Sequence, residues 1–167
     1  VGLAALGSFV YTLRRIFGAP AAFLSAGVLL TSPMFFFLTR QVMPDGIFIA
    51  FLMMAMSFTA LSLFDEEDRT LHMVVAYVCA ALAVLAKGPL ALVLIGGSLA
   101  FYFVVAAAVN FRTSSNRLTE ARHLLFGKLK LHWGVPLVLL LTLPWYVYNA
   151  VNFDIFLERL SYDYLDR

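Results

Sequence analysis

Five long apolar stretches limit what this chain can fold into. They cover residues 19–38, 47–64, 71–86, 90–109 and 131–147. Each is close to the roughly 17–25 residues that a helix needs to cross a bilayer. Only 13% of the residues are charged, about half the share found in a soluble domain. Because the runs are continuously apolar, they lack the alternation of a transmembrane β-barrel. The sequence therefore predicts an all-α, polytopic transmembrane helix bundle.

The apolar segment at the start of the chain is too short to cross a membrane alone. We interpret residues 1–13 as the end of an earlier helix, because Arg14 and Arg15 follow the segment, whereas a signal peptide carries its basic residues first. Residues 1–167 are thus expected to be a truncated part of one transmembrane domain. This part would hold about five full spans, counted from the apolar stretches.

Lysine and arginine are divided unequally between the connections, and positive residues in short loops mark the cytoplasmic side. One alternate set of connections carries Arg14, Arg15, Arg69, Arg112, Arg117, Arg122, Lys128 and Lys130. The other set carries Arg40 and Lys87, with Arg159 and Arg167 in the tail. We therefore expect residues 110–130 to form a cytoplasmic loop and residues 148–167 to begin an interfacial segment on the outer face.

Asp45 and Lys87 are charges expected on the outer face, and each has a structural and a chemical explanation. Pro44 suits the first turn of a helix, where the carboxylate of Asp45 would stabilise the helix dipole by about 0.3–1 kcal/mol. Lys87 directly precedes Gly88-Pro89 after an apolar run. Its ammonium would either extend towards the interface or bind a lipid phosphate. The sequence alone leaves structural and chemical roles open for both residues.

The C-terminal tail adds aromatic and charged side chains to the same face. Pro144-Trp145-Tyr146 is typical of a membrane interface. The charged residues beyond it, Asp163 and Arg167 among them, fit a solvated helix face or part of a site. The single cysteine, Cys79, excludes an internal disulfide.

Three motifs in this order resemble the polytopic GT-C glycosyltransferases. They are Met43-Pro44-Asp45, Leu85-Ala86-Lys87-Gly88-Pro89 and Pro144-Trp145-Tyr146. The nearest branch contains the aminoarabinose lipid A transferases and the dolichyl-phosphate-mannose protein mannosyltransferases, and the resemblance covers essentially the whole chain. It implies an inverting enzyme that transfers a sugar from a polyprenyl-phosphate donor to a lipid, protein or glycan acceptor. It also implies a bacterial inner membrane with the active site facing the periplasm.

The resemblance further implies roles for individual residues. Asp45 matches a catalytic acid of the second outer loop, and Lys87, with Arg40, is expected at the donor phosphate. Asp163 and Arg167 match an acid and an arginine of the interfacial segment that meets the acceptor. The acid expected to act as the base lies, in that family, in a first outer loop upstream of this sequence, so the chain alone is expected to be inactive. No cofactor is assigned, and the resemblance leaves open whether a divalent metal ion takes part.

Two other classes of protein stay open at this point. In a transporter or channel, Asp45 and Lys87 would line a path, and Gly96-Gly97 would be a candidate helix break. Transporters usually carry such groups near the midplane of their helices, whereas these charges are expected at helix ends. A structural membrane subunit would need neither charge for its function.

Overall fold

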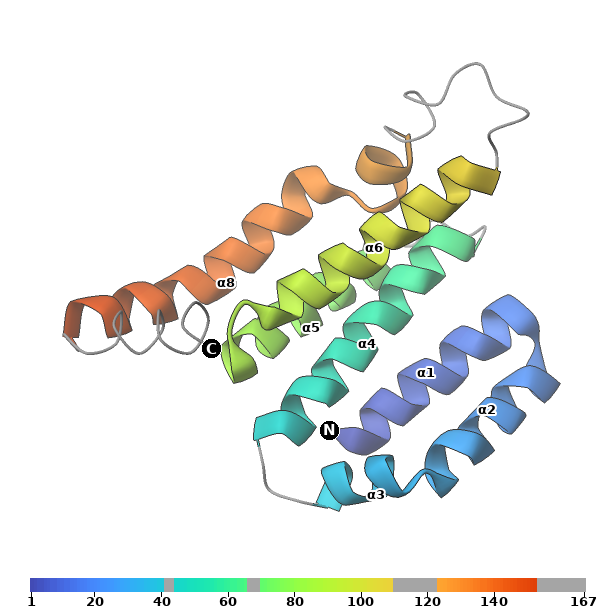
Figure 1. The fold of residues 1–167 in the computed structure, drawn as a ribbon. Coiled ribbons are helices and arrows are strands. Elements are labelled where there is room, and N and C mark those ends of the chain that lie inside the picture. The colour runs from blue at the N-terminus through green and yellow to red at the C-terminus, as the bar shows by residue number, and fades with distance from the viewer. Residues whose placement is uncertain (41–43, 66–69, 110–122, 153–167) are drawn as a thin grey trace.

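The structure, a computed structural model, describes residues 1–40, 44–65, 70–109 and 123–152, and within these ranges it contains helices and no strand (Figure 1). The α-helices are α1 (Gly2–Phe17), α2 (Ala19–Thr31), α3 (Pro33–Arg40), α4 (Pro44–Phe64), α5 (Thr70–Lys87), α6 (Leu90–Val109) and α8 (Leu131–Asn152). A π-helical turn, η2 (His123–Lys128), precedes α8. The predicted all-α bundle is confirmed.

Three of the described helices are long and apolar enough to cross a membrane. They are Asp45–Phe64, Thr70–Lys87 and Leu131–Asn152, and the apolar helices Ala19–Thr31 and Leu90–Ala106 are shorter. The chain is therefore an integral membrane protein. The count of about five full spans, the cytoplasmic placement of residues 110–130 and the interfacial segment from residue 148 stay predictions. Helix α8 itself continues beyond residue 148, as far as Asn152.

The expectation of a single helix over residues 19–38 is wrong, because the chain divides there into α2 and α3. Ser32 separates them with an extended backbone, at φ −68° and ψ 119°. The cause is Pro33, whose ring disfavours the helical conformation of the preceding residue and which has no N–H to continue the helical bonding.

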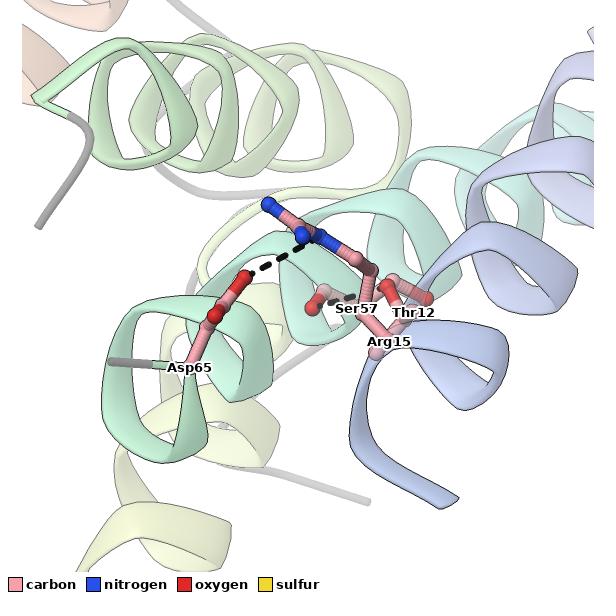
Figure 2. Close-up of polar contacts among 4 residues, drawn as sticks. All are labelled: Thr12, Arg15, Ser57 and Asp65. Atoms are coloured by element: carbon pink, nitrogen blue, oxygen red, sulfur yellow. Dashed lines mark hydrogen bonds and ion pairs between the residues drawn. The ribbon is translucent and has the colours of Figure 1, made fainter. Parts of the chain in front are cut away.

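Small side chains let α1 lie close against α4. Ala5, Ser8 and Thr12 are buried on one face of α1, and the Thr12 hydroxyl donates a hydrogen bond to the Ser57 carbonyl oxygen at 3.2 Å (Figure 2). Small residues of this kind permit close backbone approach between membrane helices. Further along the same contact, Arg15 Nε lies 3.3 Å from Asp65 Oδ2. One end of α1 is thus tied to the end of α4.

Helix α5 packs against α4, α6 and α8. Its contact with α8 depends on a close approach, because a Cβ atom at Gly134 would overlap the Tyr77 ring. The Tyr77 hydroxyl also donates to the Leu129 carbonyl oxygen at 2.8 Å, and its ring meets Trp133 edge-on. The tyrosine therefore occupies the space that glycine leaves open on α8.

The segment before α8 is anchored at the same end of the bundle as the Arg15–Asp65 contact. Lys128 Nζ donates to the Leu63 carbonyl oxygen at 2.8 Å, and Ser62 Oγ donates to the Lys128 carbonyl oxygen at 2.8 Å. Residues from two of the predicted cytoplasmic connections therefore lie at one end of α4. The opposite end of α4 carries Asp45.

Candidate active site

Asp45 and Lys87 meet at the other end of the bundle. Lys87 Nζ lies 2.6 Å from Asp45 Oδ1, and the two side chains are 43% and 47% exposed, respectively. An ion pair at this distance is a charge-assisted hydrogen bond. Because nearly half of each side chain remains accessible, an incoming molecule can reach both charges.

The backbone explains why these two residues meet. Helices α4 and α5 pack side by side and are joined at the other end, so the start of α4 lies beside the end of α5. Asp45 is in the first turn of α4 and Lys87 in the last turn of α5. Gly88 ends α5 at φ +79°, with its N–H bonded to the Val84 carbonyl oxygen at 2.7 Å. Both charges also complement their helix dipoles, so the structural explanation of Asp45 and the ion pair are compatible.

Phe48 lies beneath the ammonium group and was not among the residues predicted for the site. Lys87 Nζ is 5.7 Å from the centroid of the Phe48 ring, within the range of a cation–π interaction. Phe48 is only 5% exposed and packs with Ala83, Val84 and Ala91. Its position three residues after Asp45 places it on the same helix face, which is the signal that would have found it.

Tyr146 joins α8 to the end of α5. Its ring packs against the same apolar cluster as Phe48, and its hydroxyl donates to the Val84 carbonyl oxygen at 3.4 Å. The neighbouring Trp145 is exposed. In the Pro-Trp-Tyr motif, Tyr146 therefore contacts the last turn of α5, whereas Trp145 is exposed.

The structure does not describe the side chains of the other predicted site residues. Arg40 is the last residue of α3, but its side chain lies outside the described part of the chain, as do Asp163 and Arg167 altogether. Among the residues that are described, no three His, Cys, Asp or Glu side chains are grouped so that they could hold a metal ion. Of the predicted site residues, the structure thus brings Asp45 and Lys87 together.

An apolar groove of about 270 Å³ is lined by residues of α4, α5, α6 and α8. Ala80, Leu92, Gly96, Val138 and Leu139 are among the residues that line it. A Cβ atom at Gly96 would meet nothing within 4 Å, so the groove is open at that position. Because its walls belong to apolar helices, the groove suits a hydrocarbon chain and not a polar solute.

Comparison with known proteins identifies the family. The family model described as dolichyl-phosphate-mannose-protein mannosyltransferase matches residues 1–148. The chain belongs to this family. It is therefore a membrane glycosyltransferase of the GT-C type, as the resemblance implied. Neither the curated proteins nor the solved structures contain a match.

The alternative of a transporter or channel is not favoured for this member of the mannosyltransferase family. Helix α6 runs from Leu90 to Val109 without a break at Gly96-Gly97. The charges of the Asp45–Lys87 pair lie at helix ends, whereas transporters tend to place ionisable groups near the midplane.

Proposed function

We propose that the Asp45–Lys87 end of the bundle is part of the active site at which a sugar passes from a polyprenyl-phosphate donor to a lipid, protein or glycan acceptor. The observation that carries this proposal is the contact of 2.6 Å between two half-exposed, opposite charges at neighbouring helix ends. A phosphate-binding cation and a carboxylate are the groups that this reaction needs close together.

Lys87 is proposed to bind the donor phosphate. When the bond between the sugar and the phosphate oxygen breaks, its electron pair stays on the phosphate, so negative charge grows there. A cation already in place stabilises that charge in the transition state. Lys87 ends a membrane helix, which sets its ammonium at the depth of lipid headgroups. Arg40, which ends α3, is proposed as a second cation for the same phosphate.

Asp45 is proposed to orient the hydroxyl or amine group of the acceptor. That group must lose a proton to a carboxylate base, a step that typically contributes about 10²–10⁴-fold. By the family resemblance, the base is an acid of a preceding outer loop, and attack on the face opposite the phosphate inverts the anomeric carbon. Asp163 and Arg167 are proposed to contact the acceptor.

The apolar groove supports a lipid-linked donor. Leu92 lines the groove and follows Lys87 by five residues, just inside the start of α6. A polyprenyl tail could therefore run inward along the groove while its phosphate stays at the ammonium. This placement predicts that transfer depends on the length of the prenyl chain of the donor.

The proposed location is a bacterial inner membrane with the site facing the periplasm. The unequal division of lysine and arginine between the connections supports this orientation. The contacts of Arg15 and Lys128 at the end of α4 remote from Asp45 are consistent with it. Within the family, we propose the branch that includes the aminoarabinose lipid A transferases.

The test is donor-dependent sugar transfer by the full-length protein with Asp45→Asn and Lys87→Ala. Removal of one group that stabilises a transition-state charge lowers kcat by about 10²–10³-fold, and we expect a loss of that size for Lys87→Ala. Arg14→Ala, which removes an exposed charge at the other end of the bundle, is the matched control. Wild-type transfer by both site variants would remove the assignment.

A further inference from the structure

Contacts of two different kinds join the Lys87 ammonium to one turn of α4. One is the Asp45 carboxylate at 2.6 Å, and the other is the Phe48 ring at 5.7 Å from its centroid. Asp45 is 47% exposed, whereas Phe48 is 5% exposed. An anion that arrives from outside can therefore compete with the carboxylate but cannot displace the ring.

The carboxylate contact is easily exchanged. An ion pair between exposed side chains is weak, because water screens both charges. The donor is a sugar phosphodiester with one negative charge. When the sugar forms its bond to the acceptor oxygen or nitrogen and its bond to the phosphate oxygen breaks, the phosphate gains a second negative charge. The attraction of the ammonium to the phosphate therefore increases during the reaction, while its attraction to Asp45 does not.

The ring contact does not compete with the phosphate. The face of an aromatic ring attracts a cation through its quadrupole, and the ammonium, which has three N–H donors, keeps donors for the oxygens of a phosphate. Phe48 is held by its packing on Ala83, Val84 and Ala91, and the end of α5 is held by the Tyr146 hydroxyl on Val84. The ring and the helix end that bears Lys87 are thus packed against each other.

We propose that Phe48 is a positioning residue that keeps the Lys87 ammonium in the site while its counter-ion changes from Asp45 to the donor phosphate. The proposal rests on the proposed function, in which Lys87 binds that phosphate. Without the ring, the flexible four-carbon side chain of lysine would be held less firmly when Asp45 releases it.

The first experiment needs no transfer assay. In the full-length protein, the rate at which an amine-selective reagent modifies Lys87 is compared between wild type, Phe48→Leu and Phe48→Tyr. A cation–π contact of about 0.5–1 kcal/mol corresponds to about a two- to fivefold change, and we expect faster modification by this factor in Phe48→Leu alone. Phe51→Leu is the control, because Phe51 lies on α4 like Phe48 and packs against two of the buried apolar clusters.

The second experiment measures donor kinetics on the same variants. We expect Phe48→Leu to raise the KM for the polyprenyl-phosphate donor by about two- to fivefold with little change in kcat, and Phe48→Tyr to restore the wild-type value. Phe48→Met, also without a ring, replaces the leucine variant if that protein does not fold.

Two results would overturn the proposal: equal modification rates in wild type and Phe48→Leu, or the same increase in Phe51→Leu as in Phe48→Leu. If the full-length protein transfers no sugar from any polyprenyl-phosphate donor, the proposed function fails. The modification rates then still decide whether Phe48 holds Lys87.

Discussion

At the scale of single residues, α4 has an ion pair at each end, and the two differ in exposure. Asp45 is 47% exposed in its contact with Lys87, whereas Asp65 is 13% exposed in its contact with Arg15 (Figure 2). Water screens the first pair, so it adds little to stability. The Asp65 carboxylate is largely removed from water, so its contact with Arg15, which is 33% exposed, is screened less. The Asp45–Lys87 pair is therefore suited to chemistry and the Arg15–Asp65 pair to holding helices together.

This contrast predicts opposite effects of two equivalent substitutions. Asp65→Asn should lower the thermal unfolding midpoint of the full-length protein and leave the kinetics of the folded enzyme unchanged. Asp45→Asn should change the free energy of unfolding by less than about 1 kcal/mol and abolish most of the transfer activity. Thermal unfolding in detergent and transfer assays on both variants check this. A larger loss of stability in Asp45→Asn would show that the Asp45–Lys87 pair is structural.

At the scale of helices, the contact between α5 and α8 depends on one glycine. The Tyr77 ring lies where a Gly134 side chain would be, and its hydroxyl is bound to the Leu129 carbonyl oxygen. The ring therefore has little freedom to move aside. Because α8 also carries Tyr146, which contacts the end of α5, the spacing of these two helices matters for the position of Lys87.

We predict that Gly134→Ala destabilises the protein by about 1–3 kcal/mol, the usual cost of overpacking. Gly97→Ala is the control, because a Cβ there meets nothing within 4 Å. Tyr77→Ala in the same chain should remove most of the additional cost, giving a non-additive double-mutant cycle. Thermal unfolding of the four proteins provides the measurement. Additive effects of the two substitutions would contradict the overlap.

At the scale of the whole molecule, the proposed site requires that the Asp45–Lys87 end of the bundle face the outside. Of the three helices long enough to cross a membrane, Asp45–Phe64 then runs inwards, whereas Thr70–Lys87 and Leu131–Asn152 run outwards. The division of positive charge between the connections supports this orientation.

Cysteine labelling of intact cells tests this orientation. Since Cys79 is buried, a cysteine placed at exposed Leu90 should react with a membrane-impermeant thiol reagent, and one placed at Arg14 should react only after the membrane is opened. Cys79 in the otherwise unchanged protein is the control for background labelling. The reverse pattern would place the site in the cytoplasm and exclude the proposed periplasmic transfer.

Apart from the division at Ser32, the apolar helices and the candidate charges could be predicted from the sequence alone. Apolar runs long enough to span a bilayer leave the helix as the structure that satisfies every backbone hydrogen bond, and Gly88-Pro89 separates α5 from α6 as the motif indicated. Asp45 and Lys87 stood out because charges are rare in such a chain. Pro33 also indicated the division after Ser32, but a prediction based on the apolar composition of residues 19–38 did not detect it.

Which side chains meet depends on how the helices pack against one another. Hydropathy is a property of each residue and its chain neighbours, whereas the contact of Lys87 with Asp45 and Phe48 joins residues some forty positions apart. The same holds for Tyr77 over Gly134 and for Tyr146 on Val84. These pairs depend on the rotation and spacing of packed helices, which small residues at the helix contacts set. The hydropathy pattern of one helix does not show how that helix is rotated or spaced relative to its neighbours.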